Sequence, residues 1–251
     1  MKLKELLHNI IDINFDVEIT GVSCNPRKIK KGYLFVCISE NYKVFSNAAA
    51  VITNAHTNST GKLIFHHYPQ KIYSEIISRF YQFKQPEYVA AVTGTNGKTS
   101  TVEFCRQIWQ YAGYNAASIG TLGVCVGINR SNNIHNLTTP SADDLYATIR
   151  DINCRNLSLE ASSHGIDQYR IHGLKLHAAA FTNFSSDHLD YHHNIDEYFE
   201  AKKKLFYDVL QEGETAVLNA DVNQYSTLLN IAQKRQNKIV TYGTRGDNIT
   251  L

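Results

Sequence analysis

The chain has 251 residues, 43% of them apolar, which is enough for one large or two modest globular domains. Lys and Arg exceed Asp and Glu by only two, 25 against 23, so no overall charge points to nucleic acid or a membrane surface as a partner. The five scattered cysteines, the missing secretory signal and the absence of an apolar run of ~20 residues lead us to expect a cytoplasmic protein.

The first part of the chain alternates short strand patterns with Asn, Pro, Gly and Lys clusters that are typical of turns. Strands are predicted at 17–24, 32–38, 48–54 and 63–67. Apolar residues then recur at helical spacing between 72 and 80, before the polar, proline-bearing segment 84–87 interrupts the pattern. We therefore predict a smaller α/β domain over residues 1–86 and a second domain over 87–251.

Strand and helix patterns alternate over the second domain. Strands are predicted at 88–92, 156–163, 177–183, 215–220 and 238–243, and helices at 99–112, 142–151, 195–210 and 224–234. This alternation is typical of a doubly wound, mainly parallel α/β sheet, as in P-loop ATPase domains.

The most informative segment is 89–100, where a predicted strand runs into a glycine-bearing turn and then a helix. Gly94 and Gly97 allow a tight turn whose N–H groups face phosphates, and the helix N-terminus adds positive potential. Lys98 is expected to bridge the β and γ phosphates, and the Thr99 hydroxyl to bind Mg²⁺. Val92 stands where the full Walker pattern has its first glycine, so the alternative is a glycine turn before a surface lysine. We expect nucleotide contacts from Gly94, Thr95, Asn96, Gly97, Lys98, Thr99 and Ser100.

Three motifs in this order resemble the Mur ligases. They are Thr93–Thr99, Leu159–Arg170, and Phe181–His192 followed by Tyr198–Phe206. The serine-rich motif around Glu160, with Gln168 and Arg170, is similar to the MurE type. Folylpolyglutamate synthases of the same superfamily usually read Gly-Lys-Gly-Ser where this chain has Gly97-Lys98-Thr99-Ser100.

The resemblance implies an ATP-dependent amide ligase of peptidoglycan precursor synthesis. In that family a substrate carboxylate attacks the γ-phosphate of ATP, and an incoming amine displaces phosphate from the acyl phosphate. The MurE type adds the third amino acid to UDP-N-acetylmuramoyl-L-alanyl-D-glutamate. ATP and Mg²⁺ are thus the expected cofactors, the UDP-muramoyl-dipeptide and either diaminopimelate or lysine are the expected substrates, and we expect a monomer.

The resemblance also implies roles for individual residues. Lys98, His188 and Lys202 match catalytic positions, and Thr99, Glu160, His188 and Lys202 match the metal site. Lys202 corresponds to a lysine that the family carbamylates, which would make it a carboxylate-like ligand. Its neighbours Lys203 and Lys204 leave a solvated helix face as the alternative. The histidines near His188 match no standard zinc spacing.

Substrate contacts are implied for Thr138, Thr139, Ser162, Gln168 and Arg170. Arg170 has the clearest physical reason, because a guanidinium suits a carboxylate or phosphate. For the threonines the alternative is a loop before a helix, with Thr139 or Ser141 near the N-cap.

The chain departs from the family pattern in two places. Asn25-Pro26-Arg27 stands where the uridine-binding domain usually has Asp-Ser-Arg, and proline offers neither a hydroxyl nor an N–H. The family's third domain, which binds the incoming amino acid, has no counterpart in these 251 residues, so we expect them alone to form no tripeptide. Two hypotheses stay open: a MurE-type ligase, and a non-catalytic nucleotide-binding remnant or regulatory partner of a Mur ligase.

Overall fold

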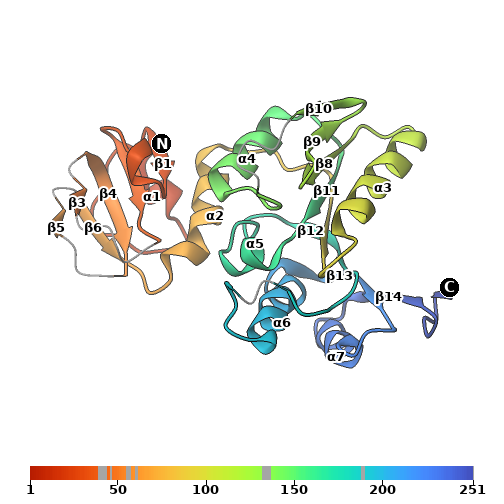
Figure 1. Cartoon of the computed structure of the whole chain (residues 1–251). Helices are drawn as coiled ribbons and strands as arrows, with labels where there is room; N and C mark the ends of the chain where they lie inside the picture. Colours follow the sequence, from red (N-terminus) through yellow and green to blue (C-terminus); the bar gives the residue numbers. More distant parts are fainter. Residues whose placement is uncertain are drawn as a thin grey trace. The chain divides into compact units, whose positions relative to one another are not determined.

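The computed structural model in Figure 1 describes residues 1–38, 44–45, 47–54, 58–59, 62–131, 137–187 and 190–250, with 44–45 and 58–59 as backbone only. The chain divides into two compact units. Unit 1 comprises Met1–Lys84 with Ala142–Ala147, and unit 2 comprises Gln85–Ser141 with Thr148–Leu251.

Unit 1 contains a four-stranded parallel sheet with strand order β1-β2-β4-β6. Its strands and helices are β1 Gly21–Ser23, β2 Tyr33–Val36, β4 Ala48–Thr53, β6 Lys62–Phe65, α1 Leu3–Leu6, the 3₁₀ helix η1 Pro26–Lys28 and α2 Pro69–Phe80, beside a two-stranded pair of β3 Val44–Phe45 and β5 Asn58–Ser59. Leu34, Phe35, Val51 and Ile52 on the sheet are fully buried, as are Ile76 and Ile77 on α2. The four predicted strands and the predicted helix are therefore all present, because their apolar residues form one small core.

Unit 2 contains a nine-stranded sheet with order β10-β9-β8-β11-β7-β12-β13-β14-β15. All neighbours are parallel except the β8–β9 and β9–β10 pairs. The strands are β7 Tyr88–Thr93, β8 Ala116–Gly120, β9 Gly123–Val126, β10 Asn129–Ser131, β11 Asn156–Glu160, β12 Leu176–Phe181, β13 Leu210–Asn219, β14 Lys238–Gly243 and β15 Ile249–Thr250. The helices are α3 Lys98–Tyr111, α5 Ser163–Asp167, α6 Ile195–Lys204 and α7 Tyr225–Lys234; helix α4 Ala142–Asp151 has its first six residues in unit 1 and the rest in unit 2. The mainly parallel sheet predicted from the alternating pattern is confirmed.

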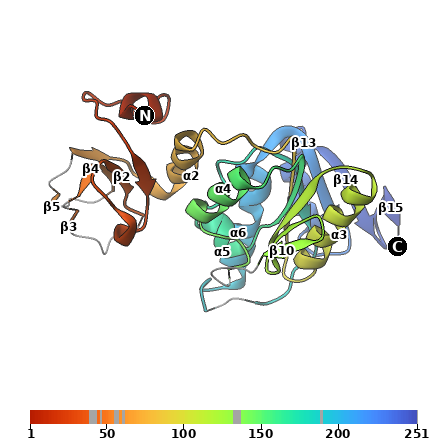
Figure 2. The ribbon, with the colours of Figure 1, turned by 90° about the horizontal axis from the view of Figure 1, so that it is seen from above.

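Strand β7 lies in the middle of this sheet, between β11 and β12. Helices cover both faces of the sheet, with α3 on one side and α5 on the other (Figures 1 and 2). A strand covered on both faces needs an unbroken apolar run, and β7 carries Val89, Ala91 and Val92, all buried. The carboxyl end of β7 is therefore held on both sides by neighbouring strands, and this fixes where the following loop begins.

Two predicted elements end earlier in the structure than expected. The strand predicted over 156–163 ends at Glu160, because the Ser162 hydroxyl accepts the N–H of Gly165 at 3.1 Å and begins helix α5. The helix predicted over 195–210 ends at Lys204, followed by a π-helical turn over Leu205–Val209 and then β13. Strands β8, β9, β10 and β15 were not predicted. Among the described residues, no helix is long and apolar enough to cross a bilayer.

Candidate functional site

The loop between β7 and α3 has the geometry of a phosphate-binding turn. Gly94 and Gly97 have φ angles of 141° and 82°, which favour glycine. A Cβ on Gly94 would lie 1.9 Å from Thr182 Oγ1, so a side chain has no room there. Gly97 is the N-cap of α3 and no side chain caps the first turn. The first N–H groups of α3 have no partner within the helix, and together with the helix dipole they favour an anion.

Lys98 folds back over this loop. Its Nζ donates to the carbonyl oxygens of Gly94 at 3.0 Å and Thr95 at 2.8 Å. Burial lowers the pKa of the Lys98 amine, while the negative charges of Glu160 and Asp187 act in the opposite direction. The lysine is therefore held beside the first turn of α3.

Glu160 lies at the carboxyl end of β11, with its carboxylate against the loop. Its Oε2 accepts the Thr99 hydroxyl at 2.9 Å, and its Oε1 accepts the N–H of Thr121 at 2.8 Å. The side chain is buried, and a Cβ on Gly120 would lie 2.2 Å from Oε1. Thr99 and Glu160 thus present two adjacent oxygens in a fixed arrangement. Oxygen donors of this kind fit Mg²⁺, which keeps several waters and takes only one or two protein carboxylates.

Lys202 on α6 is 1% exposed, which makes the solvated-face alternative wrong for this residue. Its Nζ donates to Gly94 O at 2.8 Å and lies 4.3 Å from the centre of the Tyr198 ring. Burial lowers the pKa of the amine to about 6; the positive charge of Lys98 adds to this, and Asp187 partly offsets it. The two lysines of the predicted site therefore meet at one carbonyl oxygen. The neighbouring Lys203 and Lys204 instead form ion pairs on the same helix or nearby.

His188 lies outside the described residues. Asp187, which precedes it, acts electrostatically on both Lys98 and Lys202, so this end of the segment lies beside the loop. Within the described ranges, no three His, Cys, Asp or Glu side chains gather in a metal-binding group. His192 is buried, with its ring 5.3 Å from that of Tyr198.

Thr138 and Thr139, two of the predicted substrate residues, connect with Glu160. The Thr121 hydroxyl lies 3.2 Å from the Thr138 hydroxyl and 3.3 Å from Glu160 Oε2. Thr139 is 1% exposed, and its hydroxyl donates to Glu160 O at 2.8 Å and accepts the N–H of Ser162 at 2.9 Å. The Thr139 side chain thus joins the loop before α4 to the end of β11.

The remaining predicted substrate residues are hydrogen-bonded to Thr139 directly or through one another. Arg170 donates to Thr139 O at 2.5 Å and to Gln168 Oε1 at 2.6 Å. Gln168 is exposed, and its amide donates to the Tyr191 hydroxyl at 3.2 Å. The Ser162 hydroxyl lies 3.0 Å from that of Thr139. All five predicted substrate residues are therefore joined in one network beside Glu160.

Four further residues contact the loop or Glu160, and the sequence analysis gave none of them a role of its own: Thr121, Thr182, Asn183 and Tyr198. Thr182 and Asn183 follow β12 directly, next to the strand that carries the phosphate loop. Because the carboxyl ends of neighbouring parallel strands meet at one edge, polar residues directly after a predicted strand were an available signal. Tyr198 begins the second part of the third motif of the family resemblance, whereas Thr121 carried no comparable signal.

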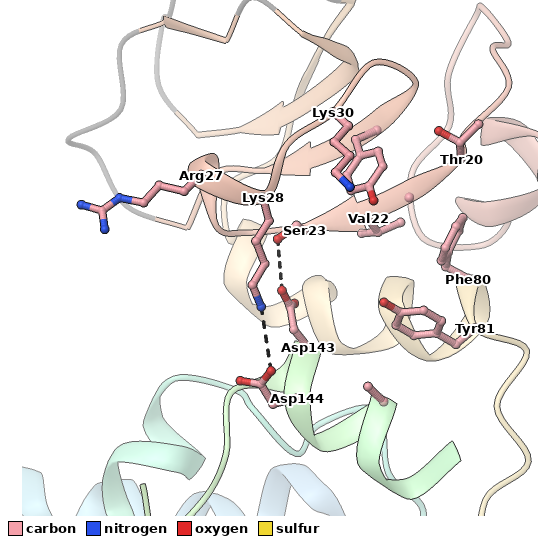
Figure 3. A pocket seen from close by; sticks show the side chains of 13 residues that line it. Thr20, Val22, Ser23, Arg27, Lys28, Lys30, Phe80, Tyr81, Asp143 and Asp144 are labelled. Atoms are coloured by element: carbon pink, nitrogen blue, oxygen red, sulfur yellow. Dashed lines mark hydrogen bonds and ion pairs between the residues drawn. The ribbon is translucent and has the colours of Figure 1, made fainter. Parts of the chain in front are cut away.

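Unit 1 contains a separate cavity of about 560 Å³ (Figure 3). Asp143 and Asp144 line this cavity. Asp143 accepts the Ser23 hydroxyl at 3.0 Å, and Asp144 lies 3.8 Å from Lys28 Nζ. Arg27 points away from these two carboxylates (Figure 3). Burial raises the pKa of Asp143 to about 6. Pro26, which stands in place of the family serine, begins η1, where the missing N–H has no cost.

The strand, glycine turn and helix, with a lysine and a threonine–glutamate pair at the helix start, define a doubly wound α/β domain of the P-loop type. A family description, the Mur ligase middle domain, matches residues 92–250. The chain belongs to this family.

Individual relatives agree with this membership. The chain is 42% identical over 248 residues to a UDP-N-acetylmuramoyl-L-alanyl-D-glutamate--2,6-diaminopimelate ligase of Anaplasma marginale, covering 93% of this chain and 52% of that protein. It is 38% identical to the Brucella melitensis protein of the same name, covering 100% and 54%. A solved structure of such a ligase superposes with a TM-score of 0.82 at 27% identity, covering 99% of this chain and 53% of that one. The chain spans about half the length of the curated relatives it matches.

Proposed function

We propose that this chain supplies the ATP-binding and substrate-activating part of a ligase that adds 2,6-diaminopimelate to UDP-N-acetylmuramoyl-L-alanyl-D-glutamate. The observation that carries the proposal is the cluster at the start of α3, where Lys98 and Lys202 share the Gly94 carbonyl and Thr99 bonds to Glu160. Relatives that are 38% and 42% identical bear the name of this ligase, which favours diaminopimelate over lysine.

The loop and α3 would hold the triphosphate of ATP. No side chain caps the N–H groups at the start of α3, which leaves them for an anion, and the Lys98 Nζ lies on the same loop, bonded to the carbonyl oxygens of Gly94 and Thr95. When phosphate oxygens replace the carbonyls of Gly94 and Thr95 as its partners, the lysine charge lies against the β and γ phosphates. Stabilising charge on the transferred phosphoryl group is the main requirement of this chemistry.

Thr99 and Glu160, together with His188, would hold Mg²⁺. The ion would neutralise charge on the phosphates and align the γ-phosphate with the substrate carboxylate. The role of this chain is to keep the two oxygens in place, and the N–H of Thr121 does so by fixing the other oxygen of Glu160 at 2.8 Å.

Lys202 would be carbamylated. Its neutral amine attacks CO₂, a C–N bond forms, and one proton leaves to give a carbamate anion. Burial and the charge of Lys98 support this step, because a pKa of about 6 leaves the amine mostly unprotonated near neutral pH. The carbamate would replace a buried, mostly neutral amine with an anionic oxygen ligand next to Lys98.

Thr138, Thr139, Ser162, Gln168 and Arg170 would bind the muramoyl-dipeptide. Arg170 and Gln168 carry the polar groups nearest the solvent side of this network, and a guanidinium binds carboxylate or phosphate in a fixed geometry. Residues 1–86 would form the UDP-binding domain, and residues 87–251 the ATP-binding domain. The five free cysteines and the near-neutral charge support a cytoplasmic monomer that acts without nucleic acid or membrane.

Calorimetry with Mg–ATP tests this proposal. The wild-type chain should bind Mg–ATP, and Lys98→Ala should lose most of the affinity because the phosphate-facing charge is gone. Lys203→Ala, which removes a lysine that pairs with Glu200, is the matched control and should bind as the wild type does. Equal affinity in the wild type and Lys98→Ala would contradict the assignment of the loop.

A further inference from the structure

The phosphate loop is hydrogen-bonded to the segment that follows β12. Three residues of this segment make the contacts: Thr182, Asn183 and Ser185. The Thr182 hydroxyl donates to Asn96 O at 2.6 Å. The Thr95 hydroxyl donates to Ser185 O at 3.1 Å and accepts the Ser185 N–H at 3.0 Å. These contacts join segments that are about ninety residues apart in the sequence.

Asn183 makes two of the contacts in this group. Its backbone oxygen accepts the N–H of Thr95 at 3.0 Å, and its side-chain Oδ1 accepts the N–H of Asn96 at 2.8 Å. The N–H groups of Thr95 and Asn96 are therefore already hydrogen-bonded to Asn183 and do not face a phosphate. The N–H groups left for a phosphate are those from Gly97 onward, at the start of α3.

The backbone at Asn96 determines how the loop enters the helix. Asn96 immediately precedes Gly97, whose φ of 82° turns the chain into α3. The Asn96–Gly97 peptide, whose carbonyl oxygen accepts the Thr182 hydroxyl, carries the Gly97 N–H. The preceding Thr95–Asn96 peptide carries the Asn96 N–H, and its rotation would move Asn96 and turn the Gly97 N–H that follows it. Glycine opposes such a rotation least of all residues, so the loop needs an external contact to keep one conformation.

We propose that Asn183 is a positioning residue for nucleotide binding: its side-chain carbonyl accepts the Asn96 N–H and so fixes the Thr95–Asn96 peptide, which orients Asn96 and the N–H groups that follow it toward the phosphates. This inference rests on the proposed function of the loop. Asn183 acts through Asn96 and touches no phosphate itself. When the N–H donors are already oriented before the nucleotide binds, less conformational entropy is lost on binding. A residue such as Asn183 can therefore affect the affinity for Mg–ATP without contacting the ligand.

The side chain of Asn183 can be tested apart from its backbone. Asn183→Leu keeps the volume and the backbone bond to Thr95, and it removes only the acceptor for Asn96. Asn183→Asp keeps the acceptor. Asn237→Leu is the matched control, because the Asn237 amide donates to Gln211 O at 2.8 Å next to the start of β14, at the opposite edge of the sheet.

The experiment measures two quantities on the full chain: the Kd for Mg–ATP by calorimetry, and the hydrogen-exchange rate of the Asn96 amide by NMR without nucleotide. Loss of one neutral hydrogen bond should weaken Mg–ATP binding by about three- to tenfold in Asn183→Leu. The Asn96 amide should exchange faster in that variant and remain protected in Asn183→Asp. Exchange is the proper readout for Asn183→Asp, because its added negative charge weakens binding of an anion for a separate reason.

Each outcome separates the inference from the proposed function. An unchanged Kd in Asn183→Leu, or an equal loss in Asn237→Leu, would overturn the positioning role while leaving the nucleotide site intact. Absence of Mg–ATP binding in the wild type would overturn the proposed function and this inference with it. If Asn183→Leu fails to fold, Asn183→Ala is measured against the same two expectations.

Discussion

Substituting Gly94 by alanine should damage the loop more than the same substitution at another glycine of positive φ. Gly94 has a φ of 141°, and its new Cβ would lie 1.9 Å from Thr182 Oγ1 and 3.0 Å from two backbone atoms of Asn183. Gly113, at the end of α3, has a φ of 86° and nothing within 4 Å of a Cβ. The two positions therefore share an unfavourable backbone conformation and differ in the steric overlap.

The expected losses follow from separate contributions. A non-glycine residue in such a conformation costs about 1 to 3 kcal/mol, and a smaller unfolded-state entropy returns about 0.4 to 1 kcal/mol. This leaves about 1 kcal/mol for Gly113→Ala. In Gly94→Ala the Thr182 hydroxyl must also move and lose its bond to Asn96, which adds about 0.5 to 1.5 kcal/mol and further strain from the backbone contacts. We expect a total of about 2 to 4 kcal/mol for Gly94→Ala.

Denaturant unfolding followed by tryptophan fluorescence measures the difference. Trp109 is the single tryptophan and lies in α3, so its signal reports the unit that contains the loop. Gly94→Ala should also lose Mg–ATP binding, whereas Gly113→Ala should retain it. Equal losses of stability in the two variants would refute the steric argument, since only one of them meets Thr182.

Lys202 should show a carbon-13 carbamate signal with labelled bicarbonate near pH 7.5, absent in Lys202→Ala and kept in Lys203→Ala; the same spectrum for all three proteins would exclude a carbamate at Lys202. Thr99→Val should reduce the magnesium dependence of ATP binding because the oxygen paired with Glu160 is removed, whereas Thr101→Val, which loses only a bond to a backbone carbonyl, should leave that dependence unchanged in calorimetric titrations. Burial raises the pKa of Asp143 to about 6 in the folded protein, above its ordinary value in the unfolded chain. The free energy of unfolding should therefore decrease as the pH rises from about 4 to about 6, because the buried carboxyl must ionise in that range. Asp143→Asn should therefore be more stable than the wild type at pH 7 and nearly equal at pH 4, and a constant difference in unfolding free energy would contradict the shifted pKa.

The sequence was sufficient for the central part of the fold because local and long-range preferences agree there. The apolar run of β7, the two glycines and the helical pattern of α3 each indicate the observed element, and Lys98 and Thr99 follow from their place in the loop. The hairpin of β8 and β9 was missed because its strands are short and lie beside glycine-rich turns, which local patterns do not separate from loops.

The details of the site depend on contacts between distant segments. Lys202 is one of three consecutive lysines, and only the packing of α6 shows that this one is buried while its neighbours form ion pairs. The hydrogen bond from the Asn96 N–H to Asn183 likewise joins positions 87 residues apart, so no local pattern contains it. Thr139 was expected as a ligand contact or a residue near a helix cap, and its hydroxyl bonds to Glu160 and Ser162.

Positional isotope exchange in ATP labelled with oxygen-18 at the β,γ-bridge tests the central claim most directly. If the chain activates a substrate carboxylate at the loop, the label should scramble only when UDP-N-acetylmuramoyl-L-alanyl-D-glutamate and Mg²⁺ are both present, because reversible phosphoryl transfer frees the β-phosphate to rotate. The exchange needs no amino acid, and Lys98→Ala should abolish it. Absence of scrambling in a wild-type chain that binds both Mg–ATP and the dipeptide would contradict the assignment of this site to acyl activation.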